Sequence, residues 1–232
     1  LKNRIPEIQH IAPRNSSGIF SGSKAQLVNG QKKGSYNIYG DFPIYTTIST
    51  VTIYDGGRFI NESDIKAKRK VCVIGERTQQ ELFNEGESPI GKFVRINGIH
   101  FRIIGVTKFV DGGGFGDDGD IFLPFTTYQR LYNTGEYVDF LLVAAYPTAD
   151  IVQVETNIRA VLKELHHVSP EDKRALGGFN IGKMFKQITK FASGMSFLSM
   201  VIGLATILGG IIGIGNILLI SVKERTKEIG VR

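Results

Sequence analysis

Charged residues are distributed unevenly along the chain. Residues 191–222 form a run of 32 residues without Asp, Glu, Lys, Arg or His, and no comparable run occurs earlier. As a helix, residues 197–222 alone would be about 39 Å long, which exceeds the ~30 Å hydrocarbon core of a bilayer. A buried helix of a soluble protein rarely stays apolar on every side over such a length. The run therefore predicts a transmembrane helix over residues 191–222.

Residues 1–190 show the shorter periods of a mixed α/β domain. The clearest element is a hairpin over residues 92–106, because Asn97-Gly98 between two β-rich arms is the usual sequence of a two-residue type I′ turn. Residues 69–75 before it predict a buried strand, and residues 76–84 predict a short helix. Together they predict a strand–helix–hairpin unit.

Further elements are expected on both sides of this unit. Residues 138–146 are apolar apart from Asp139, which predicts a strand covered on both faces. An amphipathic helix follows, with Thr148 or Asp150 as its N-cap. Near the start of the chain, two segments favour strands, residues 35–40 and 47–54. The alternation of strands and helices predicts layered α/β packing.

Composition and charge argue against nucleic-acid binding and exclude an intrachain disulfide. The net charge is +6, of which the last ten residues contribute +2 (four Lys/Arg minus two Glu), so the remaining +4 is too dispersed to indicate nucleic-acid binding. The run KAKRK at residues 66–70 is interpreted as a solvated turn before a strand. Cys72 is the only cysteine, so no intrachain disulfide can form, and its apolar neighbours predict a buried thiol.

No catalytic constellation is found. The chain lacks the phosphate-binding loop GxxxxGK[ST], the zinc motif HExxH and the nucleophile motif GxSxG. His166 and His167 are adjacent, so on a helix they would point about 100° apart and cap the helix rather than share a metal. The Asp/Gly-rich residues 111–120 lack the final Glu of a calcium loop and are interpreted as a connector. We therefore predict neither enzymatic activity nor a cofactor or metal site in this chain.

The apolar run contains a pattern of small residues. Ala205, Gly209 and Gly213 are spaced four apart, and Asn216 places an amide near the end of the run. Such a ridge lets a second helix approach closely in lipid. The pattern predicts helix–helix packing along this side.

The chain ends in a short segment of alternating charge. Glu224 and Lys227 are three residues apart and can pair across one helical turn. We expect a helical continuation that offers a docking surface for a protein, formed by Lys223, Glu224, Arg225, Thr226, Lys227 and Glu228. Lys and Arg counts at the two ends of the apolar run are four and three, which leaves orientation open.

The last residues also resemble a known family. GGIIGIGNILLISVKERTKEIGVR is similar to the end of the second transmembrane helix of MacB-like permeases of ABC transporters, which continue into Ser-Val-x-Glu-Arg-Thr-x-Glu-Ile-Gly-[Ile/Val]-Arg. The segments GGRF, VCVIGERTQQELF, SPIGKFVRINGIHFRIIGV and IFLPF resemble the extracytoplasmic core domain of the same family. The sequence starts without Met and stops abruptly at Arg232, so we expect a piece of a longer chain.

The resemblance implies a fold and a location. The expected fold is an α+β, two-lobed extracytoplasmic domain followed by a transmembrane helix in the bacterial cytoplasmic (inner) membrane. A porter-like lobe would comprise residues 1–50 and 126–190, and an inserted sabre-like lobe residues 51–125. The extracytoplasmic domain would thus end at residue 190, residues 191–222 would span the membrane, and residues 223–232 would form a cytoplasmic coupling segment.

The resemblance also implies a function. The chain would be part of a permease, homodimeric or heterodimeric, that works with a fused or separate ABC ATPase, on which ATP would bind. Movement of the external domain would drive export of antibiotics, peptides, lipids or lipoproteins, with a periplasmic adaptor and an outer-membrane channel as further partners. An FtsX-like regulator of a cell-wall hydrolase or sensor kinase is the alternative. A simple membrane-anchored binding domain is disfavoured, because it would not need the charged tail.

Overall fold

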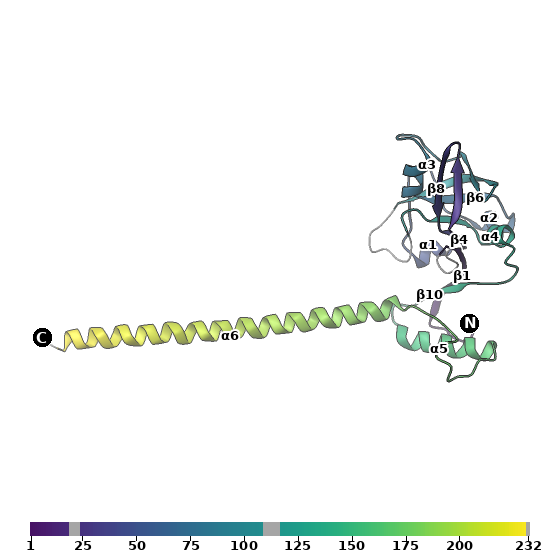
Figure 1. The fold of residues 1–232 in the computed structure, drawn as a ribbon. Helices are drawn as coiled ribbons and strands as arrows, with labels where there is room; N and C mark the ends of the chain where they lie inside the picture. Colours follow the sequence, from purple (N-terminus) through teal and green to yellow (C-terminus); the bar gives the residue numbers. More distant parts are fainter. Residues whose placement is uncertain (19–23, 109–116, 231–232) are drawn as a thin grey trace. The chain divides into compact units, whose positions relative to one another are not determined.

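The computed structural model describes residues 1–18, 24–108 and 117–230. The chain forms two compact units, Leu1–Ala149 and Asp150–Arg232. The first unit is rich in strands and the second consists of helices and their connections (Figure 1).

In the described part of the first unit, ten strands form one sheet in the order β10-β1-β4-β9-β6-β8-β7-β2-β3, with β5 paired to β8. β1 joins two parts of this sheet, since its residues from Ile8 to Arg14 pair with β10 and its last three residues pair with β4. The strands are β1 (Ile8–Ser17), β2 (Ala25–Asn29), β3 (Lys32–Tyr36), β4 (Ile38–Asp41), β5 (Thr52–Ile53), β6 (Val71–Gly75), β7 (Phe93–Ile96), β8 (Ile99–Lys108), β9 (Ile121–Pro124) and β10 (Phe140–Ala145).

Short helices cover the sheet. These are α1 (Tyr45–Ile48), α2 (Glu62–Lys66), α3 (Glu76–Leu82) and α4 (Phe125–Tyr132). Successive strand residues point to opposite faces, so Cys72 and Ile74 of β6 join a core with α3 and α4, whereas Val73 joins a second core with α1 and α2. The central strands are therefore buried on both faces.

The strand–helix–hairpin unit is confirmed. β6 is buried throughout, α3 follows directly, and β7 and β8 form the predicted hairpin. Asn97 and Gly98 have φ angles of 45° and 86°, as a type I′ turn requires. Cys72 is a buried free thiol, and the KAKRK segment is exposed.

Three expectations about strands need correction. Residues 47–54 are not one strand, because α1 occupies residues up to Ile48 and only Thr52–Ile53 pair in the sheet. The ring of Tyr45 is buried 5.7 Å from that of Phe122, and this tertiary packing overrides the local β-propensity. The segment 35–40 is divided between β3 and β4 at Asn37. The strand predicted at 138–146 is β10, which is half-buried and, among the described strands, pairs with β1 alone.

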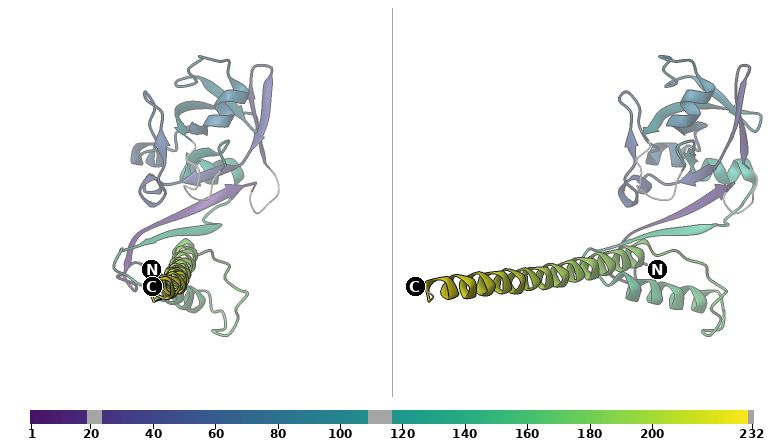
Figure 2. Two further views of the ribbon diagram at one scale, coloured as in Figure 1. Left: turned by 90° about the vertical axis from the view of Figure 1, so that its left-hand side faces the viewer. Right: turned by 60° about the vertical axis from the view of Figure 1, so that its left-hand side comes forward.

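The second unit contains α5 (Ile151–Leu165) and α6 (Ile181–Ile229). Of the two candidate N-caps, Asp150 caps α5, because its side chain accepts a hydrogen bond from the backbone N–H of Val152. α6 is one unbroken helix of 49 residues, seen nearly end-on and from the side in Figure 2. It is the one helix in the described residues that is long and apolar enough to cross a membrane. The boundaries of the porter-like and sabre-like lobes stay a prediction.

Candidate functional site

The predicted packing ridge lies in the middle of α6. Ala205, Gly209 and Gly213 are all exposed, and a Cβ atom added at either glycine would contact nothing within 4 Å. Asn216 is also exposed. Nothing in the described chain packs on this ridge, so it is free to receive another helix. Its role stays a prediction.

The first turns of α6 carry an apolar stripe that sequence reasoning missed. It consists of Ile181, Met184, Phe185 and Ile188, whose side chains are 43%, 44%, 64% and 58% exposed. At 3.6 residues per turn the four side chains fall within an arc of about 100°. Lys183, Lys186 and Lys190 lie on the opposite side of the helix. The lysines interrupt the run of uncharged residues, but they do not interrupt the 3.6-residue spacing of the apolar ones. A search for that spacing would therefore have found the stripe.

The stripe and the ridge share one seven-residue register. Gly209 and Asn216 follow Ile181 by four and five heptads, Ala205 follows Met184 by three, and Gly213 follows Phe185 by four. A strict heptad repeat keeps such positions on one side of a supercoiled helix. In a straight helix such positions drift by about 20° per heptad, so the stripe and the ridge would form one seam where α6 supercoils around a partner helix.

The start of α6 is tied to α5 by side chains. Asn180 caps α6 by accepting a hydrogen bond from the Lys183 backbone N–H at 2.8 Å, and its amide donates to Glu155 Oε2 at 2.8 Å. Arg159 donates from Nε to the other oxygen of Glu155, also at 2.8 Å. The Asn180 amide and then the Arg159 guanidinium hold the pKa of Glu155 below its ordinary value. We call Glu155, Arg159 and Asn180 the α5–α6 clamp.

Two further contacts support the clamp. Lys186 forms an ion pair with Asp150, the N-cap of α5, with 3.0 Å between Nζ and Oδ1. Gly182 lies so close to α5 that an added Cβ would stand 2.9 Å from Ile151 Cγ2. Both contacts use the polar and glycine side of α6, so the apolar stripe remains uncovered while α5 is docked.

The charged end of the chain is helical, as predicted. α6 continues to Ile229, and Lys223, Glu224, Arg225 and Thr226 are exposed. The side chains of Lys227 and Glu228 lie outside the described residues, and so does the expected Glu224–Lys227 pair. The apolar span and the charged segment are therefore parts of one helix.

A buried charge pair is a second feature that sequence reasoning missed, and no sequence signal marks it. Arg14 of β1 and Asp41 of β4 are 1% and 0% exposed, with 2.9 Å between Nη2 and Oδ2. The guanidinium carbon lies 3.7 Å from the ring centre of Tyr39 and 4.3 Å from that of Tyr45. Burial raises the pKa of Asp41 to about 6, against the opposing effect of Arg14. The pair stands at the junction of the two parts of the sheet.

In residues 1–18, 24–108 and 117–230, no group of three or more described His, Cys, Asp or Glu side chains is arranged so that it could hold a metal ion. Most of the Asp/Gly-rich loop lies outside the described residues. Its last part does not, and Asp117 and Asp118 there bind Arg77 at 2.7 and 2.6 Å. These carboxylates therefore serve as ion-pair partners.

Comparison with known proteins identifies the family. Residues 1–161 match the MacB-like periplasmic core domain. The chain belongs to this family. Over 235 residues it is 32% identical to the macrolide export ATP-binding/permease protein MacB of Bdellovibrio bacteriovorus, which covers 100% of this chain and 35% of that relative. Identity to the pyoverdine export ATP-binding/permease protein PvdT of Pseudomonas syringae pv. syringae is 28% over 231 residues, covering 98% of this chain and 33% of that relative.

Solved structures agree with this assignment. The periplasmic region of MacB from Actinobacillus actinomycetemcomitans matches with a TM-score of 0.59 and 25% identity, over 70% of this chain and 69% of that one. The extracellular domain of the noncanonical ABC-type transporter YknZ from Gram-positive bacteria matches with a TM-score of 0.59 and 16% identity, over 71% of this chain and 80% of that one, which shows a shared fold. The resemblance read from the sequence is thus confirmed.

Family and helix together define the location. A MacB-like core domain joined to a membrane-spanning helix is an inner-membrane protein with its α/β domain in the periplasm. The chain spans about a third of the length of the curated relatives it matches, 35% and 33% of the first two.

Proposed function

We propose that this chain supplies the periplasmic core domain and one transmembrane helix of an ABC transporter permease of the MacB type. Cytoplasmic ATP hydrolysis would move α6, and α6 would move the periplasmic domain. The family match supports this proposal, and so do relatives that are named export ATP-binding/permease proteins.

One observation carries the mechanical part of the proposal. α6 runs without interruption from the α5–α6 clamp, through the apolar span, into the charged segment. A helix of 49 residues is about 74 Å long and transmits displacement along its axis better than a jointed connection would. Motion at the charged end would therefore reach α5.

The charged segment is the proposed contact with the ATPase. It comprises Lys223, Glu224, Arg225, Thr226, Lys227 and Glu228, and the four described side chains are exposed. Exposed charges of both signs suit a complementary protein surface, where they determine which partner binds and in which register. ATP would bind to that ATPase, whether fused or separate.

The seam of α6 is the proposed contact with another permease helix. Ala205, Gly209 and Gly213 permit close approach in lipid, and Asn216 supplies an amide for an interhelical hydrogen bond. The proposed assembly is a dimer of permeases, with an adaptor and an outer-membrane channel as further partners. Within the domain, a porter-like lobe (residues 1–50 and 126–190) and a sabre-like lobe (residues 51–125) would be the moving parts. Antibiotics, peptides, lipids and lipoproteins are the proposed cargo classes.

Alanine insertions into α6 test whether the helix transmits motion as one rigid element with a fixed rotational register. Two alanines placed between Lys190 and Phe191 rotate the stripe about 200° away from the ridge, whereas seven alanines keep the two aligned within about 20°. The full-length protein with its ATPase, in nanodiscs, should lose substrate-stimulated ATP hydrolysis with the two-residue insertion and largely keep it with the seven-residue insertion. Equal activity of both variants would refute transmission through a register-specific helix.

Charge reversal tests the ATPase contact. Glu224→Lys with Glu228→Lys should leave membrane insertion intact but uncouple ATP hydrolysis from transport. Glu136→Lys with Glu171→Lys, a pair of exposed residues that do not belong to α6, is the matched control and should keep coupling. Normal coupling in the first variant refutes the assignment. Tail-dependent ATPase activity without transport of any cargo class would instead favour the FtsX-like regulator.

A further inference from the structure

The sheet of the first unit has one uncovered region. Residues of β2, β3, β7 and β8 that face inward are buried in the core with α3 and α4, among them Leu27, Tyr36 and Ile96. The second core, which covers the opposite face, takes its strand residues from β4, β6 and β9, with the half-buried Ile53 and Ile104 at its margin. The outer face of β3, β2, β7 and the first half of β8 is therefore open to solvent.

Strand register places basic side chains in one row across this open face. Lys33 of β3 pairs with Val28 of β2, Val28 pairs with Arg95 of β7, and Arg95 pairs with His100 of β8. Directly paired residues point to the same face. Neighbouring strands are about 4.8 Å apart, so the row crosses about 14 Å of the sheet.

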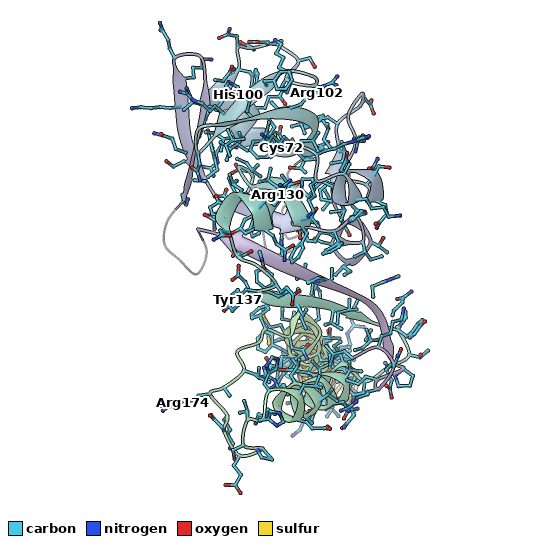
Figure 3. The ribbon with its side chains drawn as sticks, turned by 90° about the vertical axis from the view of Figure 1, so that its right-hand side faces the viewer. Cys72, His100, Arg102, Arg130, Tyr137 and Arg174 are labelled. Carbon is cyan, nitrogen blue, oxygen red and sulfur yellow. The ribbon has the colours of Figure 1, made fainter. Side chains whose placement is uncertain are left out.

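A second pair extends the row. Phe93 and Arg102 are directly opposite each other, two residues along the same strands, so they share the face with Arg95 and His100. Phe93 is 60% exposed, which is unusually high for a large apolar residue on a strand of this unit. Figure 3 labels His100 and Arg102, which extend from the same hairpin strand. We call Lys33, Arg95, His100 and Arg102, with Phe93 and Val28, the basic sheet face.

The charges of this face are not balanced locally. β2, β3, β7 and β8 contain no Asp or Glu. None of the ion pairs found among the described residues involves Lys33, Arg95 or Arg102. In contrast, Arg58 and Arg77 of the same unit are each bound to a carboxylate. The face thus has cationic donors available to a partner.

We propose that the basic sheet face is a docking surface for an acidic protein segment that also presents apolar side chains. Guanidinium groups bind carboxylates through paired hydrogen bonds. Phe93 and Val28, placed between the cations, give apolar contact area to the same partner. Addition of a strand at the β3 edge is disfavoured, because Lys32 and Lys33 on an edge strand oppose such pairing. The partner therefore lies across the face rather than along the edge.

The test measures binding of a defined probe to the full chain in nanodiscs of zwitterionic lipid. The probe is a fluorescein-labelled twelve-residue peptide of alternating Glu and Leu, and the control peptide has Gln in place of Glu. We expect the acidic peptide to bind and the Gln peptide to bind at least about tenfold more weakly. Affinity should fall as salt rises from about 0.05 to 0.3 M, because exposed charges are screened over that range.

Matched variants locate the site. Arg95→Glu with Arg102→Glu should weaken binding at least about tenfold and remove most of its salt dependence. Lys2→Glu with Lys66→Glu alters two exposed basic residues outside β2, β3, β7 and β8 in the same unit and should change affinity less than about twofold. Phe93→Ser should weaken binding while keeping the salt dependence. All four positions of the charge variants are exposed, so the thermal unfolding of each variant should match that of the unaltered chain.

Two results would overturn the proposal. One is equal loss of binding in both charge-reversal pairs, which would show a nonspecific attraction to positive charge. The other is displacement of the peptide by vesicles containing phosphatidylglycerol, with vesicle binding itself abolished by Arg95→Glu and Arg102→Glu, which would assign the face to a lipid surface. The assay needs no ATP hydrolysis, so its outcome does not depend on the transport proposal.

Discussion

Removal of one member of the buried Arg14–Asp41 pair should destabilise the first unit more than removal of both. The two side chains are 1% and 0% exposed. Arg14 pairs with Phe140 of β10, and the next residue, Asn15, pairs with Gly40 of β4. The charges therefore lie where β1 passes from one part of the sheet to the other, and neither can reach water without opening that junction.

The expected magnitude follows from this burial. Breaking a buried pair from one side leaves an uncompensated charge and typically costs about 3–5 kcal/mol, whereas replacing both partners with apolar side chains is often neutral or stabilising. Arg14 also lies over the rings of Tyr39 and Tyr45. Loss of these cation–π contacts adds about 1–2 kcal/mol to any variant that lacks the guanidinium.

Three variants separate these contributions. Asp41→Leu should lower the free energy of unfolding by about 3–5 kcal/mol and Tm by about 6–20 °C. Arg14→Met should cost at least as much, and the double variant should lie within about 2 kcal/mol of the unaltered chain. Urea unfolding followed by near-ultraviolet circular dichroism would measure all three. Additive losses, without coupling between the two sites, would refute the reasoning.

Three further predictions concern other parts of the structure. Cys72 is buried and burial raises the pKa of its thiol, so a maleimide should label it only when the first unit unfolds, as mass spectrometry would show; rapid labelling of the native protein would contradict this. Gly98→Ala should destabilise the β7–β8 hairpin by about 1–2 kcal/mol in thermal unfolding, because its φ of 86° disfavours a Cβ. The clamp should loosen as pH falls, because the pKa of Glu155 is lower in the folded protein than its ordinary value of 4.5. The ionised carboxylate therefore stabilises the clamp fully at pH values above 4.5, and this stabilisation is lost as the pH falls through the pKa of the folded state. Limited proteolysis by pepsin between residues 166 and 180 would detect the loosening, and Glu155→Gln should remove its pH dependence.

Features that depend on neighbours in sequence could be predicted from the chain alone. The absence of charge over residues 191–222 predicted α6, and Asn97-Gly98 predicted the hairpin, because each signal lies within the element that it describes. Predicted elements were wrong where contacts with residues far away in the sequence determine the local conformation. Thr47 belongs to a β-branched segment that favours a strand, yet α1 forms there because Tyr45 packs against Phe122 from β9.

Both charge features of the first unit depend on strand register. Arg14 and Asp41 are 27 residues apart, and no local period links them. Lys33 and Arg95 join one row only because each pairs with Val28 from its own side. A shift of one residue in either pairing would turn the basic side chain of the shifted strand toward the core and break the row. Such features become visible only when the sheet order is known.

The length of α6 bears on the proposed function. Its 49 residues extend about 74 Å, whereas a bilayer with its headgroups is about 40–45 Å thick. About 30 Å must therefore lie outside the membrane, and residues 223–229 account for only about 10 Å of it. The remaining ~20 Å corresponds to about the first thirteen residues of α6, which carry the exposed stripe from Ile181 to Ile188. In water an uncovered apolar stripe of this kind is unfavourable. A partner helix that covers the ridge in lipid would, in the same heptad register, also cover the stripe outside it, so the seam suits an assembly that is held together on both sides of the membrane surface.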